Sequence, residues 1–295
     1  MHPDEAATDA ELVERLLVAQ FPAWAHLPLT RIGSTGTDNA LYRLGPELAV
    51  RMPRRPSAAG QVAKEARWLP VLAPHLPLAI PVPLATGLPG EGYPHPWGVY
   101  RWLERNTAHA AQLAHPGAAA ESLAEFLTAL QAIDASDAPL PGAHNSYRGV
   151  PLAARDRAVR AALAHLDGEI DTAAAMAAWE RSLAAPAWAG PPVWIHGDLS
   201  PFNLLARDGE LTAVIDFGCL GAGDPACDLQ PAWNLLPPAA RERFRARLAP
   251  GEAAWERGRG WALSVAIIQL PYYRDTNPGL AANARFTIAA VLAER

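Results

Sequence analysis

The predominant period of the hydrophobic pattern changes near residue 103, and this change sets the fold class. Before residue 103, short apolar segments are separated by Gly, Pro and Asn, as in residues 29–52. Such segments predict antiparallel strands. Beyond residue 106, apolar residues recur every three or four positions, most clearly over 121–134, which predicts helices. We therefore expect an α+β protein with a small β-rich lobe over 1–103 and a larger helical lobe over 104–295.

Within this frame the patterns locate individual elements. The first lobe is expected to hold three short strands within 29–52, a further strand over 97–103, and helices over 11–21 and 61–72. The proline-rich segment 77–83 cannot continue a helix. In the second lobe, further helices are predicted over 151–166, 172–183, 239–248, 253–270 and 278–294.

The helical half is interrupted at residues 193–222. Two short apolar segments, 204–206 and 213–215, are joined across Asp208-Gly209, a dipeptide suited to a tight hairpin turn. A hairpin inserted among helices usually presents functional groups. Polar residues stand on both sides of it: HGDLSPFN at 196–203 and IDFG at 215–218.

The spacing of Asp198, Asn203 and Asp216 fits phosphoryl transfer. A hydroxyl nucleophile needs a group that accepts or orients its proton, which we assign to Asp198. A nucleotide needs magnesium, which prefers oxygen ligands and retains several waters. Asn203 and Asp216 supply such oxygens, and the hairpin returns one toward the other. Singly, each residue is equally well explained as a helix cap or turn residue; the ordered set is not.

These residues carry a resemblance to the aminoglycoside phosphotransferase family, and the segment GDPACDL at 223–229 is similar to that family's continuation. Glycine at 197, where protein kinases usually carry arginine, favours this family over them. The resemblance implies a bilobal protein-kinase-like fold with an inserted catalytic hairpin. It also implies a small-molecule kinase that uses Mg²⁺ with ATP or GTP, and the catalytic set His196, Asp198, Asn203 and Asp216.

The resemblance further implies a phosphate-covering loop between the first two strands. The residues there are Ser34, Thr35, Gly36 and Thr37, but they match no glycine-rich consensus, and a plain hairpin turn explains them as well. A basic residue on the third strand is expected to contact the phosphates and to pair with a helix glutamate.

Arg51 with Glu65 is the favoured pair for that role. The alternative cation, Lys64, is the only lysine of the chain and is adjacent to Glu65, so the two face different directions on a helix. A surface ion pair of small effect is the plain explanation of Arg51 and Glu65. By resemblance, backbone groups from Arg101 to Leu103 form the hinge that meets the purine.

The acceptor is a small hydroxylated molecule, with an aminoglycoside or macrolide-like antibiotic as the first expectation and antibiotic resistance as its implication. No acidic run suited to a polycation is present; residues 241–247 instead contain four arginines. Aromatic residues offer either stacking surfaces or core packing: Trp233, Trp255, Trp261, Tyr272 and Tyr273. The alternatives are a kinase of a metabolite such as choline, homoserine or a sugar amine, and a nucleotide-binding protein without catalysis.

Composition excludes some partners. The formal charge of −5 and a pI near 6.0 provide no basic field for nucleic acid or an anionic membrane. We find no secretory signal pattern and no apolar run of membrane-spanning length. Two cysteines, Cys219 and Cys227, make no disulfide framework. A cytoplasmic location is therefore expected, and the sequence carries no signal for an oligomeric state.

Overall fold

The computed structural model describes residues 5–33, 38–103 and 113–294. The chain divides into two compact units. The first comprises Met1–Pro74, Ala79–Glu104 and Val214–Gly218, and the second comprises His75–Leu78, Arg105–Ala213 and Cys219–Arg295. Two short segments thus group differently from a simple division after residue 103. One of them, Val214–Gly218, contains Asp216 and belongs to the first unit.

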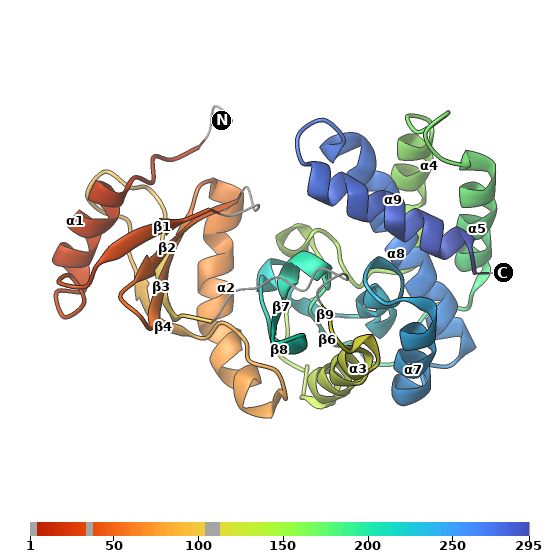
Figure 1. Ribbon diagram of the computed structural model, residues 1–295, viewed down its shortest axis with the longest axis horizontal. Coiled ribbons are helices and arrows are strands. Elements are labelled where there is room, and N and C mark those ends of the chain that lie inside the picture. The colour runs from red at the N-terminus through yellow and green to blue at the C-terminus, as the bar shows by residue number, and fades with distance from the viewer. Residues whose placement is uncertain (1–4, 34–37, 104–112, 295) are drawn as a thin grey trace. The chain divides into compact units, whose positions relative to one another are not determined.

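The first unit is built on a five-stranded antiparallel sheet in the order β1-β2-β3-β5-β4 (Figure 1). Its strands are β1 (Leu29–Ile32), β2 (Asn39–Leu44), β3 (Leu48–Pro53), β4 (Pro83–Gly87) and β5 (Trp97–Arg101). Helix α1 (Ala10–Gln20) covers it with Leu12, Val13, Leu16 and Leu17, which pack in one core with Tyr42 and Trp97 of the strands. Alternation of buried and half-buried residues along β2 shows why this segment forms a strand.

Two details of this unit differ from the sequence expectation. Helix α2 (Pro56–Leu72) begins five residues before the expected start, because Pro56 occupies the first helical turn, where its missing N–H costs nothing. Strand β4 begins at Pro83, at the end of the segment in which we expected only a helix stop. It lies at the edge of the sheet, where a proline is tolerated.

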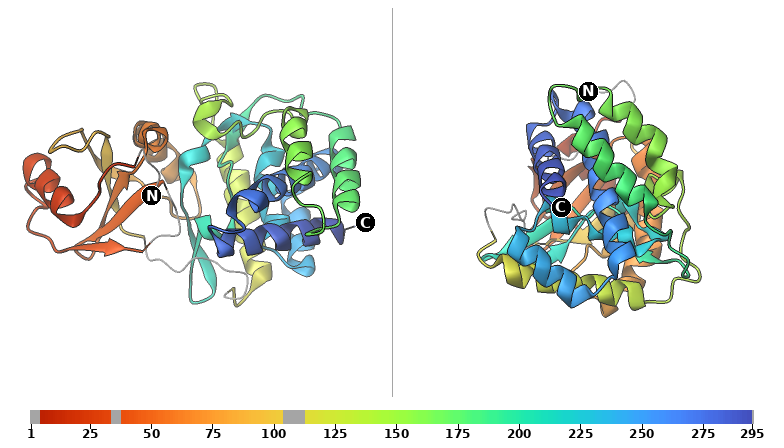
Figure 2. Two further views of the ribbon diagram at one scale, coloured as in Figure 1. Left: turned by 90° about the horizontal axis from the view of Figure 1, so that it is seen from above. Right: turned by 90° about the vertical axis from the view of Figure 1, so that its right-hand side faces the viewer.

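The second unit is mainly helical, as expected, and the α+β fold class is confirmed. Figures 1 and 2 show α3 with α7 on one side of this unit and α4, α5 and α9 gathered about α8. Its helices are α3 (Pro116–Ala132), α4 (Asp156–Leu163), α5 (Thr172–Ala184), α6 (Pro231–Asn234), α7 (Pro238–Leu248), α8 (Glu252–Tyr273) and α9 (Pro278–Leu292). The expected helix over 151–166 is divided into a 3-10 turn (Leu152–Arg155) and the shorter α4.

The predicted hairpin is present. Strands β7 (Leu204–Arg207) and β8 (Glu210–Val214) form a two-stranded sheet. Asp208 and Gly209 both have positive φ, 54° and 81°, as the two central residues of a type I′ turn require. Asn203 directly precedes β7, and Asp216 follows β8 by two residues.

Candidate active site

Two short strands of the second unit hold the loop that contains Asp198. β6 (Val193–Ile195) pairs antiparallel with β9 (Gly221–Gly223), so that Ile195 faces Gly221. The HGD segment leaves the end of β6, and the segment with Asp224 and Asp228 follows β9. The pairing of β6 with β9 therefore places the HGD segment beside the segment with Asp224 and Asp228, although more than twenty residues separate them in the chain.

Asp228 locks the backbone of this loop. Its carboxylate accepts the backbone N–H of His196 at 2.6 Å and that of Gly197 at 2.7 Å, and its side chain is wholly buried. Burial raises the pKa of Asp228, while the nearby His196 and the two N–H groups act in the opposite direction. Bonds from backbone N–H groups to a buried carboxylate are among the stronger hydrogen bonds in proteins. The Asp228 carboxylate therefore holds the backbone of the loop in one conformation at His196 and Gly197.

Gly197 is required by its surroundings. Its φ is +85°, and a Cβ at this position would lie 2.7 Å from the carbonyl oxygen of Cys219 and 3.0 Å from Cβ of Arg148. Only glycine adopts this conformation without strain in so little space. The glycine noted in the sequence therefore has a packing reason here.

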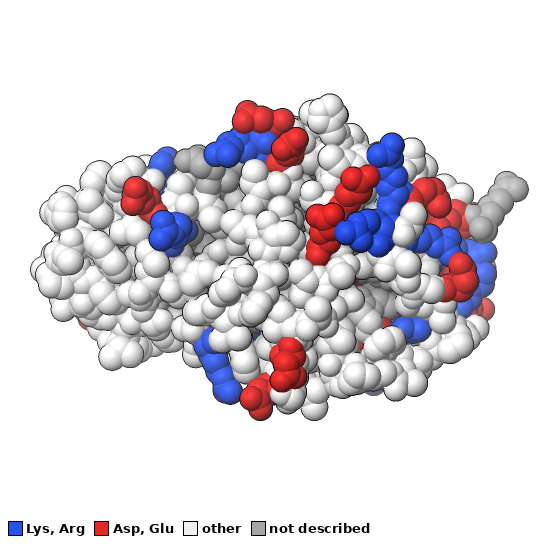
Figure 3. All heavy atoms as spheres, turned by 90° about the horizontal axis from the view of Figure 1, so that it is seen from below, with Lys and Arg blue, Asp and Glu red and all other residues white. Residues whose placement is uncertain are grey.

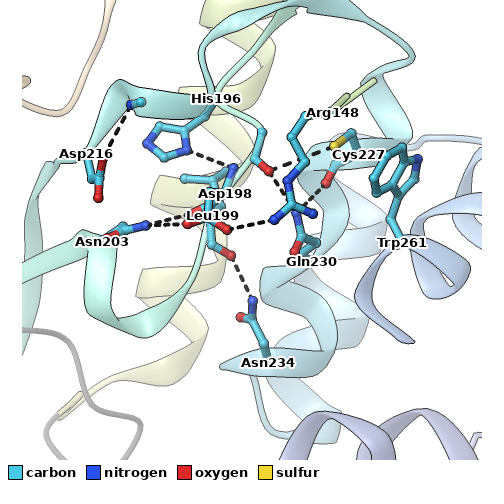
Figure 4. Close-up of polar contacts among 12 residues, drawn as sticks. Arg148, His196, Asp198, Leu199, Asn203, Asp216, Cys227, Gln230, Asn234 and Trp261 are labelled. Carbon is cyan, nitrogen blue, oxygen red and sulfur yellow. Dashed lines mark hydrogen bonds and ion pairs between the residues drawn. The ribbon is translucent and has the colours of Figure 1, made fainter. Parts of the chain in front are cut away.

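Asp198 and Asn203 are joined directly (Figure 4). Asn203 Nδ2 donates to the Asp198 backbone oxygen at 2.8 Å and to its carboxylate Oδ2 at 3.1 Å. A 3-10 turn over Pro201–Asn203 carries the asparagine inward. The backbone N–H of Asp198 donates to Nδ1 of the buried His196 at 3.2 Å. The structure thus brings three sequence-predicted residues together, with the Asp198 side chain 29% exposed.

A residue that the sequence did not single out also contacts Asp198. Arg148 Nη2 donates to Oδ1 at 3.4 Å, and Arg148 is buried. No motif marks it, because it lies 50 residues earlier in the chain and its neighbours form no recognisable pattern. The adjacent glycine, Gly149, is a weak sequence signal of an unusual local backbone, and its φ is +81° in the structure.

In the first unit, Asp216 lies beside Arg51. Asp216 has a φ of +63°, its Oδ1 accepts the N–H of Gly218 at 3.3 Å, and it lies 3.9 Å from Arg51 Nη2. Its side chain is 54% exposed. Among the residues that the structure describes, this carboxylate keeps an accessible face that a cation can approach.

Arg51 and Glu65 form the expected pair. Arg51 Nη1 donates to Glu65 Oε1 at 2.5 Å and Nη2 donates to Gln61 at 3.0 Å, while Tyr100 donates to the other Glu65 oxygen at 2.8 Å. Burial disfavours the charge on Arg51, but Glu65, Tyr100 and Asp216 together outweigh burial and raise the Arg51 pKa. The arginine therefore stays charged and is held by two residues of α2, which makes it more than a surface ion pair.

The structure gives fewer contacts for the remaining residues that were predicted to bind the nucleotide. Ser34, Thr35, Gly36 and Thr37 lie outside the described residues. Arg101 ends β5 opposite Leu48 and is exposed, and Leu103 follows it half-buried. Lys64 Nζ donates to the Gly218 backbone oxygen at 2.6 Å, so the alternative cation also reaches the segment that carries Asp216.

Asp224 and the aromatic residues serve the core. Asp224 is buried and accepts Arg257 Nε at 2.7 Å and Nη2 at 3.1 Å, so it braces β9 against α8. The three tryptophans named from the sequence are buried, and Trp233 packs on Trp255 with ring centroids 4.6 Å apart. Tyr272 is exposed. Core packing therefore accounts for Trp233, Trp255 and Trp261.

The arginines of α7 are engaged with acids. Arg243 and Arg247 lie 3.5 and 3.3 Å from Glu121 and Glu125 of α3, and Arg245 lies 2.5 Å from Glu252. On the face drawn in Figure 3, acidic and basic side chains stand next to each other, and no field of one sign covers it. In the described residues, no helix is both long and apolar enough to cross a membrane.

The residues present fit a magnesium ion in their chemistry. Because Asn203 uses Nδ2 toward Asp198, its carbonyl oxygen is directed away from that carboxylate. Asp216 adds an exposed carboxylate. Magnesium sites often use one or two protein oxygens, with waters and phosphates completing the coordination. No group of three or more His, Cys, Asp or Glu suited to a metal occurs in the described residues.

Comparison with known proteins finds similar sequences and similar folds. An aminoglycoside 3'-phosphotransferase of Escherichia coli is 31% identical over 130 residues, which cover 43% of this chain and 48%, about half, of that relative. A solved GDP and kanamycin complex of an aminoglycoside 2"-phosphotransferase superposes with a TM-score of 0.72 over 96% of this chain and 99% of the other, at 18% identity. A macrolide 2'-phosphotransferase from Brachybacterium faecium superposes with a TM-score of 0.61 at 26% identity, over 96% of this chain and 98% of the other.

The expected resemblance is thereby confirmed. A family model described as the phosphotransferase enzyme family matches residues 29–261. This range includes every described residue of the five-stranded sheet and the whole segment from His196 to Asp228. The chain belongs to the phosphotransferase enzyme family.

Proposed function

We propose that this protein transfers the γ-phosphate of a magnesium nucleotide, ATP or GTP, to a hydroxyl group of a small molecule in the cytoplasm, where these nucleotides are available. The observation that carries the proposal is the loop over 196–203. In this loop the Asp198 carboxylate accepts a hydrogen bond from the Asn203 amide, and the buried Asp228 holds the loop backbone. Such pre-organisation is costly for a surface loop and is typical of catalytic loops.

In the proposed reaction Asp198 accepts the proton of the acceptor hydroxyl. The acceptor oxygen bonds to the γ-phosphorus as the bond from phosphorus to the bridging oxygen of the β-phosphate breaks, so that a nucleoside diphosphate leaves. Asn203 holds Oδ2 of Asp198 and thereby fixes the direction from which the hydroxyl approaches. Most of the rate enhancement in phosphoryl transfer comes from such positioning and from charge stabilisation.

Asn203 and Asp216 are the proposed magnesium ligands. The ion, when bound, neutralises charge on the phosphate oxygens. Arg51 is the proposed phosphate contact, because Glu65 and Gln61 fix its guanidinium in the place where the resemblance expects a basic residue. Backbone groups from Arg101 to Leu103 are the proposed purine contacts, and Ser34 to Thr37 the proposed phosphate-covering loop.

A macrolide-like antibiotic is the favoured acceptor, with antibiotic resistance as the biological consequence. Of the two solved structures compared above, the macrolide phosphotransferase has the higher identity, 26% against 18%. The aminoglycoside 3'-phosphotransferase of Escherichia coli is 31% identical over 130 residues, which keeps an aminoglycoside as the alternative antibiotic acceptor. The charges around Asp198 favour the macrolide-like acceptor. Arg148 contacts Asp198, and Arg155 stacks on Trp261 with its guanidinium carbon 4.9 Å from the ring centre. Cations near the proposed base disfavour a polycationic aminoglycoside.

A metabolite with an anionic group is the second candidate acceptor. Among the described residues Arg155 has no carboxylate within ion-pair distance and donates its Nε to Ser264 at 3.0 Å. Burial and the neighbouring Arg148 lower the Arg155 pKa to about 10. A nearby anion on the acceptor would relieve this repulsion. Of the metabolites expected from the sequence, homoserine carries such a group, whereas choline is a cation.

The test is magnesium-dependent consumption of ATP and GTP by the purified protein with macrolides, aminoglycosides and hydroxylated metabolites, each offered separately. Wild type is expected to turn over with at least one acceptor class. Asp198→Ala is expected to lose at least about 1,000-fold in kcat while it still binds nucleotide. Turnover by Asp198→Ala at a rate close to wild type would contradict the role of Asp198. Nucleotide binding without turnover on any acceptor would favour the binding protein without catalysis.

A further inference from the structure

Arg148 approaches Asp198 from a segment to which neither the motif nor the family resemblance assigns a role. The guanidinium Nη2 lies 3.4 Å from Oδ1 of Asp198, and the Arg148 side chain is 9% exposed. Figure 4 shows the side chain directed from its own segment toward Asp198. Burial disfavours its charge, but the Asp198 carboxylate, Cys219 and Cys227 together outweigh burial and raise the Arg148 pKa, so the residue stays a cation.

The segment that carries Arg148 is held by its own hydrogen bonds. Asn145 is 1% exposed, its Oδ1 accepts the N–H of Gly142 at 3.0 Å, and its Nδ2 donates to the Arg148 backbone oxygen at 3.1 Å. The backbone N–H of Arg148 donates to the backbone oxygen of Asn145 at 3.1 Å. The buried Asn145 side chain thus links the backbone at Gly142 to the backbone of Arg148.

The same segment is fitted closely to β6 and β9. A Cβ on Gly221 would lie 2.7 Å from Asn145 Nδ2, and a Cβ on Gly149 would lie 2.6 Å from Ile195 Cδ1. The Asp224 N–H donates to the Gly149 oxygen at 3.0 Å. Because β6 leads directly into the loop with Asp198, this packing ties the position of Arg148 to that of the loop.

The backbone beside Arg148 also carries strain. Ser146 and Tyr147 have φ values of 54° and 55°, which residues with a side chain adopt only where the surroundings enforce it. Two consecutive residues of this kind immediately before a buried arginine indicate that the segment is shaped to deliver that side chain.

Gly197 makes the approach possible. A Cβ at 197 would lie 3.0 Å from Cβ of Arg148, so the space beside the glycine is the space that the arginine stem occupies. The cation that protein kinases usually carry within the loop, at this position, is absent here, and Arg148 brings one to the loop from 50 residues earlier.

We propose that Arg148 is the positioning residue of the proposed base: it holds Oδ1 of Asp198 while Asn203 holds Oδ2, and Gly197 provides the space for it. The proposal rests on the proposed role of Asp198. With both oxygens anchored, the carboxylate plane is fixed, and each oxygen retains a lone pair for the acceptor hydroxyl. Positioning of this kind acts on the chemical step and leaves nucleotide binding almost unchanged.

The experiment compares Arg148→Met and Arg148→Ala with wild type on the acceptor that gives turnover. Methionine fills most of the arginine stem volume without the charge. We expect kcat of Arg148→Met to fall by roughly 100-fold, with the KM for nucleotide within about twofold of wild type. For Arg148→Ala, guanidinium ion at tens of millimolar is expected to restore kcat at least about tenfold, and urea of the same concentration is not, since it lacks the charge.

The outcomes separate the two proposals. Wild type that phosphorylates no acceptor contradicts the proposed function. Wild type that turns over, with Arg148→Met at half its kcat or better, contradicts only the role of Arg148, as does equal recovery of Arg148→Ala by urea and guanidinium. If Arg148→Ala does not fold, Arg148→Met decides alone: a loss confined to kcat supports positioning, and an equal loss of nucleotide affinity overturns it.

Discussion

His196 and Gly197 donate their backbone N–H groups to one buried carboxylate, that of Asp228, and this contact shapes the proposed catalytic loop at the scale of single residues. The loop then needs a positive φ at residue 197 and no side chain there, because the Cys219 oxygen and the Arg148 stem fill the space. A glycine in a motif can be needed for a positive φ or for the space that a Cβ would fill. Residue 197 must be glycine for both reasons.

Gly197→Ala therefore combines two penalties, and Gly168→Ala separates them. Gly168 has a φ of +75° with nothing within 4 Å of a Cβ, so the control should lose only about 1 kcal/mol through backbone strain. Gly197→Ala should lose more stability and most of its kcat, since the loop must shift. Urea unfolding and steady-state kinetics measure both. Equal behaviour of the two variants would show that room at residue 197 is unimportant.

Arg51 provides a second prediction at this scale. Arg51→Met removes the proposed phosphate contact and leaves the buried Glu65 carboxylate with Tyr100 as its remaining hydrogen-bond partner among the described residues. We expect kcat/KM for nucleotide to fall by about 10- to 100-fold or more, and Arg51→Lys to retain more of it because the charge remains. The matched control is Arg31→Met on the exposed side of β1, which should leave nucleotide kinetics unchanged. Unaltered kinetics in Arg51→Met would remove this residue from the site.

At the scale of elements, α8 connects the helical core to the loop. It is buried along most of its length, from Trp255 to Leu270. Gly258 lets it approach the 3-10 turn Pro225–Leu229, because a Cβ there would lie 2.6 Å from Cβ of Leu229. Leu229 follows Asp228 directly, so the position of α8 is transmitted to the carboxylate that locks the loop.

Gly258→Ala should therefore destabilise the protein although alanine favours helices. On an exposed helix the change stabilises by about 1 kcal/mol, and we expect this sign for Gly60→Ala in α2, where nothing lies within 4 Å of a Cβ. At Gly258 overpacking should instead cost about 1–3 kcal/mol. Thermal unfolding of both variants measures the sign. A stabilised Gly258→Ala variant would show that α8 and the 3-10 turn can move apart without loss of folding free energy.

At the scale of the whole molecule, the chain forms two compact units. Asp198 and Asn203 belong to the second unit, and Asp216 and Arg51 to the first. The segment Val214–Gly218 joins the first unit although its neighbours on both sides belong to the second. The backbone N–H of Val214 donates to Ala79 at 2.9 Å, and Lys64 donates to Gly218 at 2.6 Å, which explains this grouping.

Ligand binding should accordingly stabilise the folded chain. Magnesium nucleotide at 100 times its Kd is expected to raise the free energy of unfolding by about 2.7 kcal/mol, and EDTA should remove most of that gain. Asp216→Asn should show a smaller gain at the same concentrations because it loses a charged oxygen ligand. Thermal unfolding with and without EDTA measures this. The same magnesium-dependent gain in Asp216→Asn would exclude it as a ligand.

The fold class and the central motif were predictable from the sequence because they depend on local features. A period of two or of 3.6 is visible within a single segment, and the Asp208-Gly209 turn needs only its own two residues. The Arg51 and Glu65 pair was also predictable, since a strand and the next helix bring them together at a separation of 14 residues. Helix starts were missed where a proline begins the helix, as at Pro56 in α2.

By itself, therefore, the sequence determined the α+β fold class and the resemblance to the phosphotransferase family, and it singled out Asp198, Asn203 and Asp216 for the proposed site. Only the tertiary structure decided that Asp228 locks the loop, that Trp233, Trp255 and Trp261 belong to the core, and that Arg148 reaches Asp198. The reason is physical: these contacts join segments 30 to 50 residues apart. Burial and close packing of such segments depend on how the strands and helices assemble, which no local pattern records.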